Sequence, residues 1–190
     1  MKVMLVSNAP ALADGRETVA SLRLLADSTV GRVNEPLFYP DHLGVEWQAV
    51  VAPAIRIGRL GTNIHLRHAE GYIDAVAAAL LLAPAGGCSE AVDRCSMMLD
   101  RAIIPGAFVP VEPGALTITV TDCDGSVRAE YPDLTSRAVA ALCTLSKFGT
   151  VRTGDLLVLT DAAVPVRVSE GLEVSASIGD GPVTLNVRVR

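Results

Sequence analysis

His65 and His68 are three residues apart, a spacing that places two imidazole rings on one face of a helix, where they can share a metal ion. Protein metal sites normally use three or four ligands, so this pair alone does not define one. We therefore interpret both residues as surface histidines.

The cysteines do not form a recognisable metal or redox motif. None of the four belongs to a CxxC pair or to a Cys/His cluster with the spacing of a zinc site. They are Cys88, Cys95, Cys123 and Cys143. We interpret them as reduced, mostly buried thiols of a cytoplasmic protein, with a disulfide between Cys88 and Cys95 as the alternative.

Covalent catalysis has few candidate residues in this chain. Lys2 and Lys147 are the only lysines, which leaves almost none for Schiff-base chemistry, and no serine lies in a GxSxG motif. Arg56 and Arg59 flank the end of a predicted strand and can hold an anion. We interpret these two arginines as solvated or paired.

The composition indicates one domain and excludes two classes of partner. The 190 residues, 50% of them hydrophobic, are enough for a sizeable core. The net charge of −5, the lack of a basic run and the 4% aromatic content argue against nucleic-acid binding. The longest uncharged apolar run, residues 75–85, is far shorter than the roughly 20 residues of a membrane span. The first ten residues predict a strand rather than a signal peptide, so we expect a cytoplasmic protein.

Periodicity in the first half of the chain predicts a strand over 1–7, a helix over 16–27 and a strand over 46–57. Pro53 interrupts the last of these, which indicates an edge strand or a bulge. A helix over 65–73 and a buried strand over 74–82 follow, although the alanine-rich second segment favours a helix by intrinsic propensity.

The second half of the chain predicts mainly hairpins. Residues 89–102 are helical or irregular, and 116–131 alternate about a DCDG turn, which predicts a β-hairpin. An amphipathic helix over 134–148 ends before a glycine, and a terminal hairpin turns at 179–181. Because regular βαβ alternation is absent, we predict an α+β, mostly β fold: a mixed β-roll or β-barrel with a few flanking helices.

Four stretches of the chain resemble the fumarylacetoacetate hydrolase family, in its C-terminal catalytic-domain type. They are "NEPLFYPD", "RIGRLGTNIHLRHAEGYIDAV", "LDRAIIPGAFVPV", and "LTSRAVAALCTLSKFGTVRTGDLLVLT" with "VSEGLEVSASIGDGPVTLNVRV". Together they cover most of residues 34–190, whereas 1–33 match poorly. We therefore expect a single domain over 1–190 with a poorly matching N-terminal segment over 1–33.

The resemblance implies a mixed β-roll, usually in a homodimer. It also implies Mg²⁺- or Mn²⁺-dependent hydrolysis, decarboxylation or isomerisation of diketo acids. A divalent ion held by carboxylates chelates the keto-acid oxygens and stabilises the enolate that forms in such reactions.

The positions that match the family's three metal ligands do not carry acids in this chain. Counting back from Arg56, the family's E-x-E pair falls at Val50 and Ala52, and the family's Asp falls at Leu81. Counting forward from residues 38–41 moves the pair to 49 and 51. A shifted alignment moves it to Glu46 and Gln48 and keeps one acid.

Other functional positions of the family are also replaced. Its active-site lysine falls at Met97, and its substrate-binding Thr-Gly-Thr-Pro loop falls at Leu159, Thr160, Asp161 and Ala162. A carboxylate at 161 would repel a substrate carboxylate. Asp41, Glu46 and Asp100 are weak residual candidates, and for Asp100 we favour a structural role in a turn near the pocket.

These replacements predict a catalytically silent homologue that acts as a homodimer or as a subunit alongside an active relative. On this interpretation we expect no metal and no other cofactor. One alternative is a divalent-metal-dependent hydrolase, decarboxylase or isomerase of acylpyruvate-like diketo acids with a rebuilt site, which would use Mg²⁺ or Mn²⁺. Another alternative is a small-molecule binding module.

Overall fold

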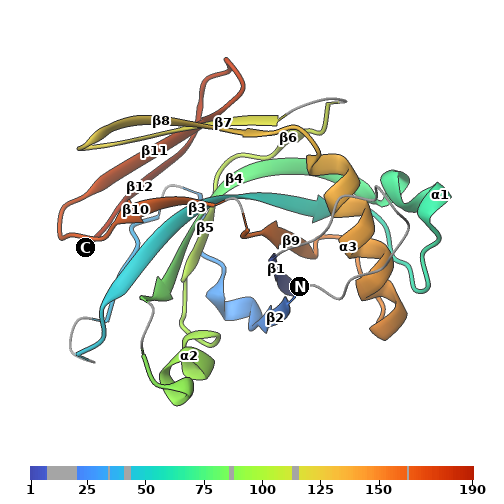
Figure 1. Ribbon diagram of the computed structural model, residues 1–190, viewed down its shortest axis with the longest axis horizontal. Helices are drawn as coiled ribbons and strands as arrows, with labels where there is room; N and C mark the ends of the chain where they lie inside the picture. Colours follow the sequence, from blue (N-terminus) through green and yellow to red (C-terminus); the bar gives the residue numbers. More distant parts are fainter. Residues whose placement is uncertain (8–20, 34, 41–43, 86–87, 113–115, 162) are drawn as a thin grey trace.

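The computed structural model of the chain describes residues 1–7, 21–33, 35–40, 44–85, 88–112, 116–161 and 163–190. These residues form two β-sheets and three α-helices (Figure 1). The strands are β1 (Val3–Ser7), β2 (Ser21–Leu25), β3 (Trp47–Ile57), β4 (Ile73–Pro84), β5 (Ile103–Pro105), β6 (Val109–Pro110), β7 (Leu116–Asp122), β8 (Gly125–Tyr131), β9 (Leu156–Leu159), β10 (Val164–Arg167), β11 (Glu173–Ile178) and β12 (Val183–Arg188). The helices are α1 (Leu66–Ala69), α2 (Glu90–Ser96) and α3 (Leu134–Phe148). No helix in these ranges is long and apolar enough to cross a bilayer.

The larger sheet has eight strands in the order β2-β1-β9-β3-β4-β5, with β10 also pairing with β3 and β6 with β4. The smaller sheet has the order β12-β11-β7-β8. In Figure 1 the smaller sheet lies above the long strands β3 and β4, and α2 lies below them. This mostly β, α+β architecture confirms the fold class predicted from the sequence.

Both faces of β3 and β4 are buried, which explains their nearly continuous apolar sequences. One face contributes Val51, Ile55 and Leu80 to the main core, which α3 and the smaller sheet complete. The opposite face contributes Ala52 and Leu81 to a second apolar cluster beside β1 and β9. Burial on both faces therefore selects the strand in β4 over the helix that its alanines favour.

Most predicted elements are confirmed, including the hairpins β7–β8 and β11–β12 and the helix over 134–148. The predicted helix over 16–27 is wrong where the structure describes it. Residues 21–25 form β2, which pairs antiparallel with β1 over its whole length. Leu22 and Leu24 alternate with Ser21, Arg23 and Leu25, and this period-2 pattern suits a strand.

Of the two structures predicted around Pro53, the edge strand is wrong, because β3 is a central strand, and the register shift in β3 lies at Arg56/Ile57 rather than at the proline. Pro53 pairs with Ala78 of β4, and the Ala78 carbonyl accepts from Gly106 N on the other side at 2.8 Å. The Pro53 nitrogen therefore faces away from β4. On that side β10 pairs with β3 up to Val51 and β9 pairs from Ala54 onward, so the proline lies in the gap between two partners.

This placement predicts that Pro53→Ala is destabilising. The substitution adds a buried N–H opposite a gap in the ladder and frees the unfolded chain, with an expected loss of about 1–3 kcal/mol. Urea denaturation measures the change. Pro165→Ala in β10 is the matched control, since Pro165 is exposed and its loss should be smaller. Equal losses of unfolding free energy in the two variants would contradict the placement of Pro53 in the gap between β9 and β10.

The prediction of mostly buried cysteines is wrong. Cys143 is buried in α3, Cys88 is half-buried, and Cys95 and Cys123 are exposed. Cys88 and Cys95 both carry free thiols, so the alternative disulfide between them does not form in this structure. Cys95 lies on α2 and Cys123 at the tip of the β7–β8 hairpin, and both are exposed among the described residues.

Candidate functional site

A cavity of about 300 Å³ opens on the face of the larger sheet that carries the second apolar cluster. Its walls come from β1, β2, β3, β4, the start of β5, the end of α2 and the residue after β9. The residues that line it are Leu5, Ser7, Ser21, Arg23, Leu25, Gln48, Val50, Leu81, Leu82, Ala83, Ser96, Met97, Ala102, Ile103 and Thr160. Most of this surface is apolar, with polar groups at its rim.

The topology brings the three predicted ligand positions together. Val50 lies directly opposite Leu81 in the antiparallel β3–β4 ladder, and Ala52 lies two residues farther along the same face of β3. All three belong to or pack on the second apolar cluster. Val50 and Leu81 line the cavity, and Ala52 is fully buried beside them. None of these side chains offers an oxygen to a cation.

Two further positions predicted from the family line the same cavity. Met97 follows α2, and Thr160 follows β9. Leu159 is buried in the main core on the opposite face of the sheet. Ala162 and Asp41 lie outside the described residues.

The alternative ligand positions are placed less favourably. Gln48 lines the cavity, but Glu46 is exposed and is not part of the lining. Residues 49 and 51 are buried on the other face of β3, in the main core. Asp100 is exposed in the turn after α2 and is also outside the lining.

Asp161 does not line the cavity, although its neighbour Thr160 does. Its carboxylate forms an ion pair with Arg137 of α3, and the two side chains are only 16% and 15% exposed. The charge at this position is therefore compensated by α3. The prediction that Asp161 would repel a substrate carboxylate did not take this partner into account.

Tyr131 lies close enough to Arg137 for the two groups to interact electrostatically. Burial raises the pKa of the Tyr131 phenol to about 12, against a smaller lowering effect from the Arg137 charge. The folded-state pKa thus exceeds the unfolded value of 10.0, so the stabilisation is present below pH 10 and is lost as the pH rises toward 12.

We therefore predict an alkaline loss of stability that depends on Tyr131. The unfolding free energy should fall by about 2–3 kcal/mol between pH 10 and 12 from this residue alone. Urea titrations of the unmodified chain and of Tyr131→Phe at several pH values isolate the contribution of Tyr131 to the unfolding free energy. All other titrating groups are the same in the two proteins. Parallel pH curves for the two proteins would contradict the prediction.

Hydrogen bonds already occupy much of the cavity rim. Thr160 Oγ1 donates to Val6 O at 3.2 Å, and Ser96 Oγ donates to Asp93 O at 2.6 Å. Both hydroxyls therefore retain only acceptor capacity. Gln48 Nε2 donates one weak bond to Pro84 O at 3.4 Å and keeps its second N–H.

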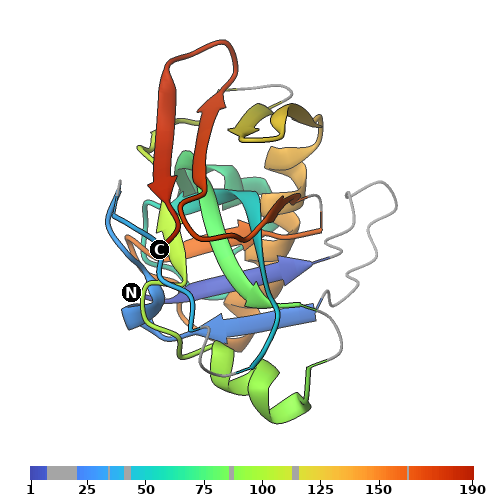
Figure 2. The same ribbon diagram turned by 90° about the vertical axis from the view of Figure 1, so that its left-hand side faces the viewer.

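The β2 side of the rim carries the remaining donors. Ser7 and Ser21 are a cross-strand pair whose hydroxyls are hydrogen-bonded to each other, which leaves one of the two protons free. Arg23 Nη1 donates to Asp93 Oδ1 of α2 at 2.8 Å. Figure 2 shows β1 and β2 in blue side by side, with α2 in green below them.

Sequence reasoning missed Ser7, Ser21 and Arg23 as residues of this site. The cause is the helix predicted over 16–27, which hides the cross-strand relation of β2 to β1. The signal that could have found them is the alternation of Ser21, Arg23 and Leu25 with the exposed leucines between them.

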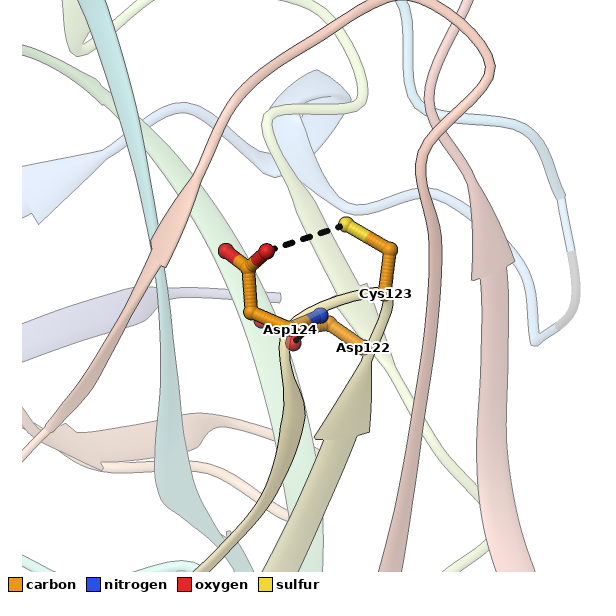
Figure 3. Close-up of side chains that lie close together, drawn as sticks. All are labelled: Asp122, Cys123 and Asp124. Carbon is orange, nitrogen blue, oxygen red and sulfur yellow. Dashed lines mark hydrogen bonds between the residues drawn. The ribbon is translucent and has the colours of Figure 1, made fainter.

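A second group of metal-binding side chains lies in the β7–β8 turn, on the smaller sheet and outside the cavity lining (Figure 3). It consists of Asp122, Cys123 and Asp124. Asp122 Oδ1 accepts from Asp124 N at 2.9 Å, and Cys123 Sγ lies 3.8 Å from Asp124 Oδ1. These contacts are those of a polar two-residue hairpin turn.

The two predicted histidines are surface residues, as expected. His65 precedes α1 and its Nδ1 accepts from Arg67 N at 3.3 Å, while His68 Nε2 accepts from Arg67 Nε at 2.9 Å. Arg56 is paired with Asp74 through a 2.8 Å hydrogen bond and lies over the Phe108 ring.

No family model and no curated protein matches the sequence. Solved structures do match the fold over essentially the whole chain. Fumarylpyruvate hydrolase from Pseudomonas aeruginosa, in complex with Mn²⁺ and pyruvate, aligns with a TM-score of 0.73 and 20% identity, over 100% of this chain and 89% of that one. Maleylpyruvate hydrolase from Sphingobium sp. SYK-6, with manganese(II) and pyruvate, aligns with a TM-score of 0.78 and 18% identity, over 99% and 69%.

A third similar structure is 2-hydroxyhepta-2,4-diene-1,7-dioate isomerase from Mycobacterium marinum, with a TM-score of 0.77 and 19% identity over 99% of this chain and 73% of that one. These likenesses confirm the resemblance to the fumarylacetoacetate hydrolase family at the level of the fold. Identities of 20% and below establish no more than the fold.

The expectation of no cofactor is contradicted by these neighbours. Two of them contain manganese, which points to a divalent metal as the cofactor associated with this fold. The lining of the cavity does not match that chemistry well. Among its described residues the oxygen donors are the hydroxyls and the amide named above, and none is a carboxylate, which Mg²⁺ and Mn²⁺ sites usually include.

Proposed function

The chain has the fold of the fumarylacetoacetate hydrolase family, and we propose that it is a catalytically silent homologue that keeps the cavity as a binding site for a small organic molecule. One observation carries this proposal: Val50, Leu81, Met97 and Thr160 all meet in one cavity, and its described lining has neither a carboxylate nor a lysine. A site without a general base or acid can bind, but it lacks groups that move protons.

The apolar floor supports a binding role. Ligand pockets are mostly apolar with a few polar groups that fix orientation, and about 300 Å³ is at the small end of their range. The hydroxyls of Thr160 and Ser96 are held by backbone carbonyls, so they present acceptors in fixed positions. The ligand class that suits this cavity is therefore a short, largely aliphatic molecule.

A turnover assay tests the silent assignment. The purified chain is mixed with an acylpyruvate in millimolar Mn²⁺, and loss of the enol absorbance is followed. We expect a rate no higher than that of Mn²⁺ without protein. Protein-dependent turnover would overturn the proposal, and its loss in Glu46→Ala would assign the activity to the shifted alignment.

The manganese and pyruvate in two similar structures favour a second candidate function. It is a divalent-metal-dependent hydrolase or isomerase of acylpyruvate-like substrates with a rebuilt site. A bound divalent ion would supply a Lewis acid for an enolate. The residues available for such a site are Gln48 and Thr160 in the cavity and Glu46 before β3.

The oligomeric state stays a prediction. We propose a homodimer, or a mixed assembly with an active relative, because large apolar side chains such as Leu60, Leu66 and Phe148 are exposed on the single chain. Light scattering at micromolar concentration is expected to give twice the 19.8 kDa mass of one chain. A mass equal to one chain would contradict the homodimer.

A further inference from the structure

The charge and donor pattern of the cavity points to one class of ligand, and we infer that it binds a short aliphatic monocarboxylate whose carboxylate meets Arg23. This inference rests on the proposed binding function and specifies its ligand. It is carried by residues of β1 and β2, which lie before residue 34 and outside the four stretches that resemble the family in sequence.

Arg23 is the only charged residue among the described residues that line the cavity. Its ion pair with Asp93 uses Nη1 and one carboxylate oxygen, at 2.8 Å. A guanidinium has five N–H donors in a planar fork, so donors remain for a second anion. The side chain is 47% exposed, which leaves it accessible at the rim.

The hydroxyls next to Arg23 extend the donor surface. In the β1–β2 ladder Leu5 is opposite Arg23, and Ser7 is opposite Ser21, so the four side chains share the cavity face. The Ser7–Ser21 hydrogen bond uses one hydroxyl proton and leaves the other free. The β2 side thus offers a cation with a neighbouring O–H donor, which is the pattern that a carboxylate accepts.

The rest of the cavity is suited to the body of the ligand. Val50, Leu81 and Ile103 form an apolar floor, and Met97 provides an unbranched thioether wall. Thr160 and Ser96 donate to backbone carbonyls and cannot donate to an anion. Gln48 of β3 keeps one free N–H, but this donor is neutral and has no charged neighbour in the lining comparable to Arg23. A carboxylate is therefore favoured at the β2 side and an alkyl chain over β3 and β4.

Asp93 competes with the ligand for Arg23. It reaches Arg23 from α2, and the same two segments are joined by the bond from Ala26 N to Met97 O at 3.3 Å. Removing the Asp93 charge frees the guanidinium without removing any part of the cavity lining. Neutralising Arg23 should therefore weaken carboxylate binding, whereas neutralising Asp93 should strengthen it.

Calorimetry with hexanoate and with the neutral isostere hexanamide tests the inference on the full chain. We expect hexanoate to bind at least about tenfold more tightly than hexanamide, a preference that falls with added salt. Arg23→Gln should abolish the preference, whereas Asp93→Asn should increase it. Arg94→Gln is the matched control, since Arg94 lies on α2 in an exposed pair with Glu90 and is expected to leave both affinities unchanged.

Each outcome has a distinct meaning. Equal binding of the two compounds, or a parallel loss in Arg23→Gln and Asp93→Asn, would overturn the carboxylate inference and leave the cavity as a site for neutral molecules. Near-native circular dichroism and melting temperatures of the variants exclude misfolding as the cause. Turnover of acylpyruvates, which the enol absorbance reports separately, would overturn the silent assignment and not the role of Arg23.

Discussion

The triple variant Val50→Glu, Ala52→Glu and Leu81→Asp is expected to lose more than about 5 kcal/mol of unfolding free energy, which is most of the stability of a typical domain. The three positions lie in one apolar cluster, where Ala52 is fully buried and Leu81 is 4% exposed. Carboxylates placed there would be desolvated among the apolar side chains of this cluster, and they would repel one another.

The same variant tests whether these positions are equivalent to the family's metal ligands. Val50 and Leu81 face each other across the β3–β4 ladder, and residue 52 follows on the same face, so three carboxylates there can converge on one ion. A ligand that binds only the folded state raises its stability by mass action. Millimolar Mn²⁺ is therefore expected to raise the melting temperature of the triple variant more than that of the unmodified chain.

A matched control separates burial from net charge. The variant Val127→Glu, Met98→Asp and Val183→Glu adds the same three charges at side chains that are 55%, 73% and 60% exposed. It should remain close to the unmodified chain in stability and gain nothing specific from Mn²⁺. If Mn²⁺ raises the melting temperatures of both triple variants equally, the three buried positions do not form a metal site, and the alignment is wrong.

The sequence predicts most of the fold because many elements are determined by local patterns. The β7–β8 hairpin follows from alternation around a polar two-residue turn, and α3 follows from an apolar stripe that ends before a glycine. Strand β4 was harder to predict from the sequence, because its alanines favour a helix. Its assignment depends on burial on both faces between β3 and β5, which is a tertiary effect.

The errors arise where partners distant in sequence decide the structure. Strand β2 pairs with β1 at the edge of the sheet, and its alternation spans only five residues, too few to outweigh the helical spacing of the longer 16–27 segment. Pro53 is accommodated in a central strand because β9 and β10 meet there, which no local rule anticipates. The resemblance identified Val50, Leu81 and Met97 as former functional positions, and these three line the cavity, whereas the donors on β1 and β2 required the structure.

The ion pair between Arg137 and Asp161 was likewise invisible in the sequence, since 24 positions separate residues 137 and 161. It joins α3 to the residue after Thr160, and so connects the main core to the rim of the cavity. We expect Arg137→Met to cost about 3 kcal/mol, because it leaves the Asp161 carboxylate, only 16% exposed, without its cation. Urea denaturation near neutral pH measures this loss.

Two further measurements distinguish a paired charge from simple loss of packing. The double variant Arg137→Met and Asp161→Leu should be more stable than Arg137→Met alone, because no unpaired charge remains. The Tyr131 phenol provides the second readout, since the Arg137 charge lowers its pKa, and Arg137→Met should therefore shift its titration to higher pH. Arg128→Met is the control, because the Arg128–Asp180 pair is solvent-exposed and should contribute little. An unchanged Tyr131 titration together with additive stability losses would show that Arg137 contributes packing and not charge.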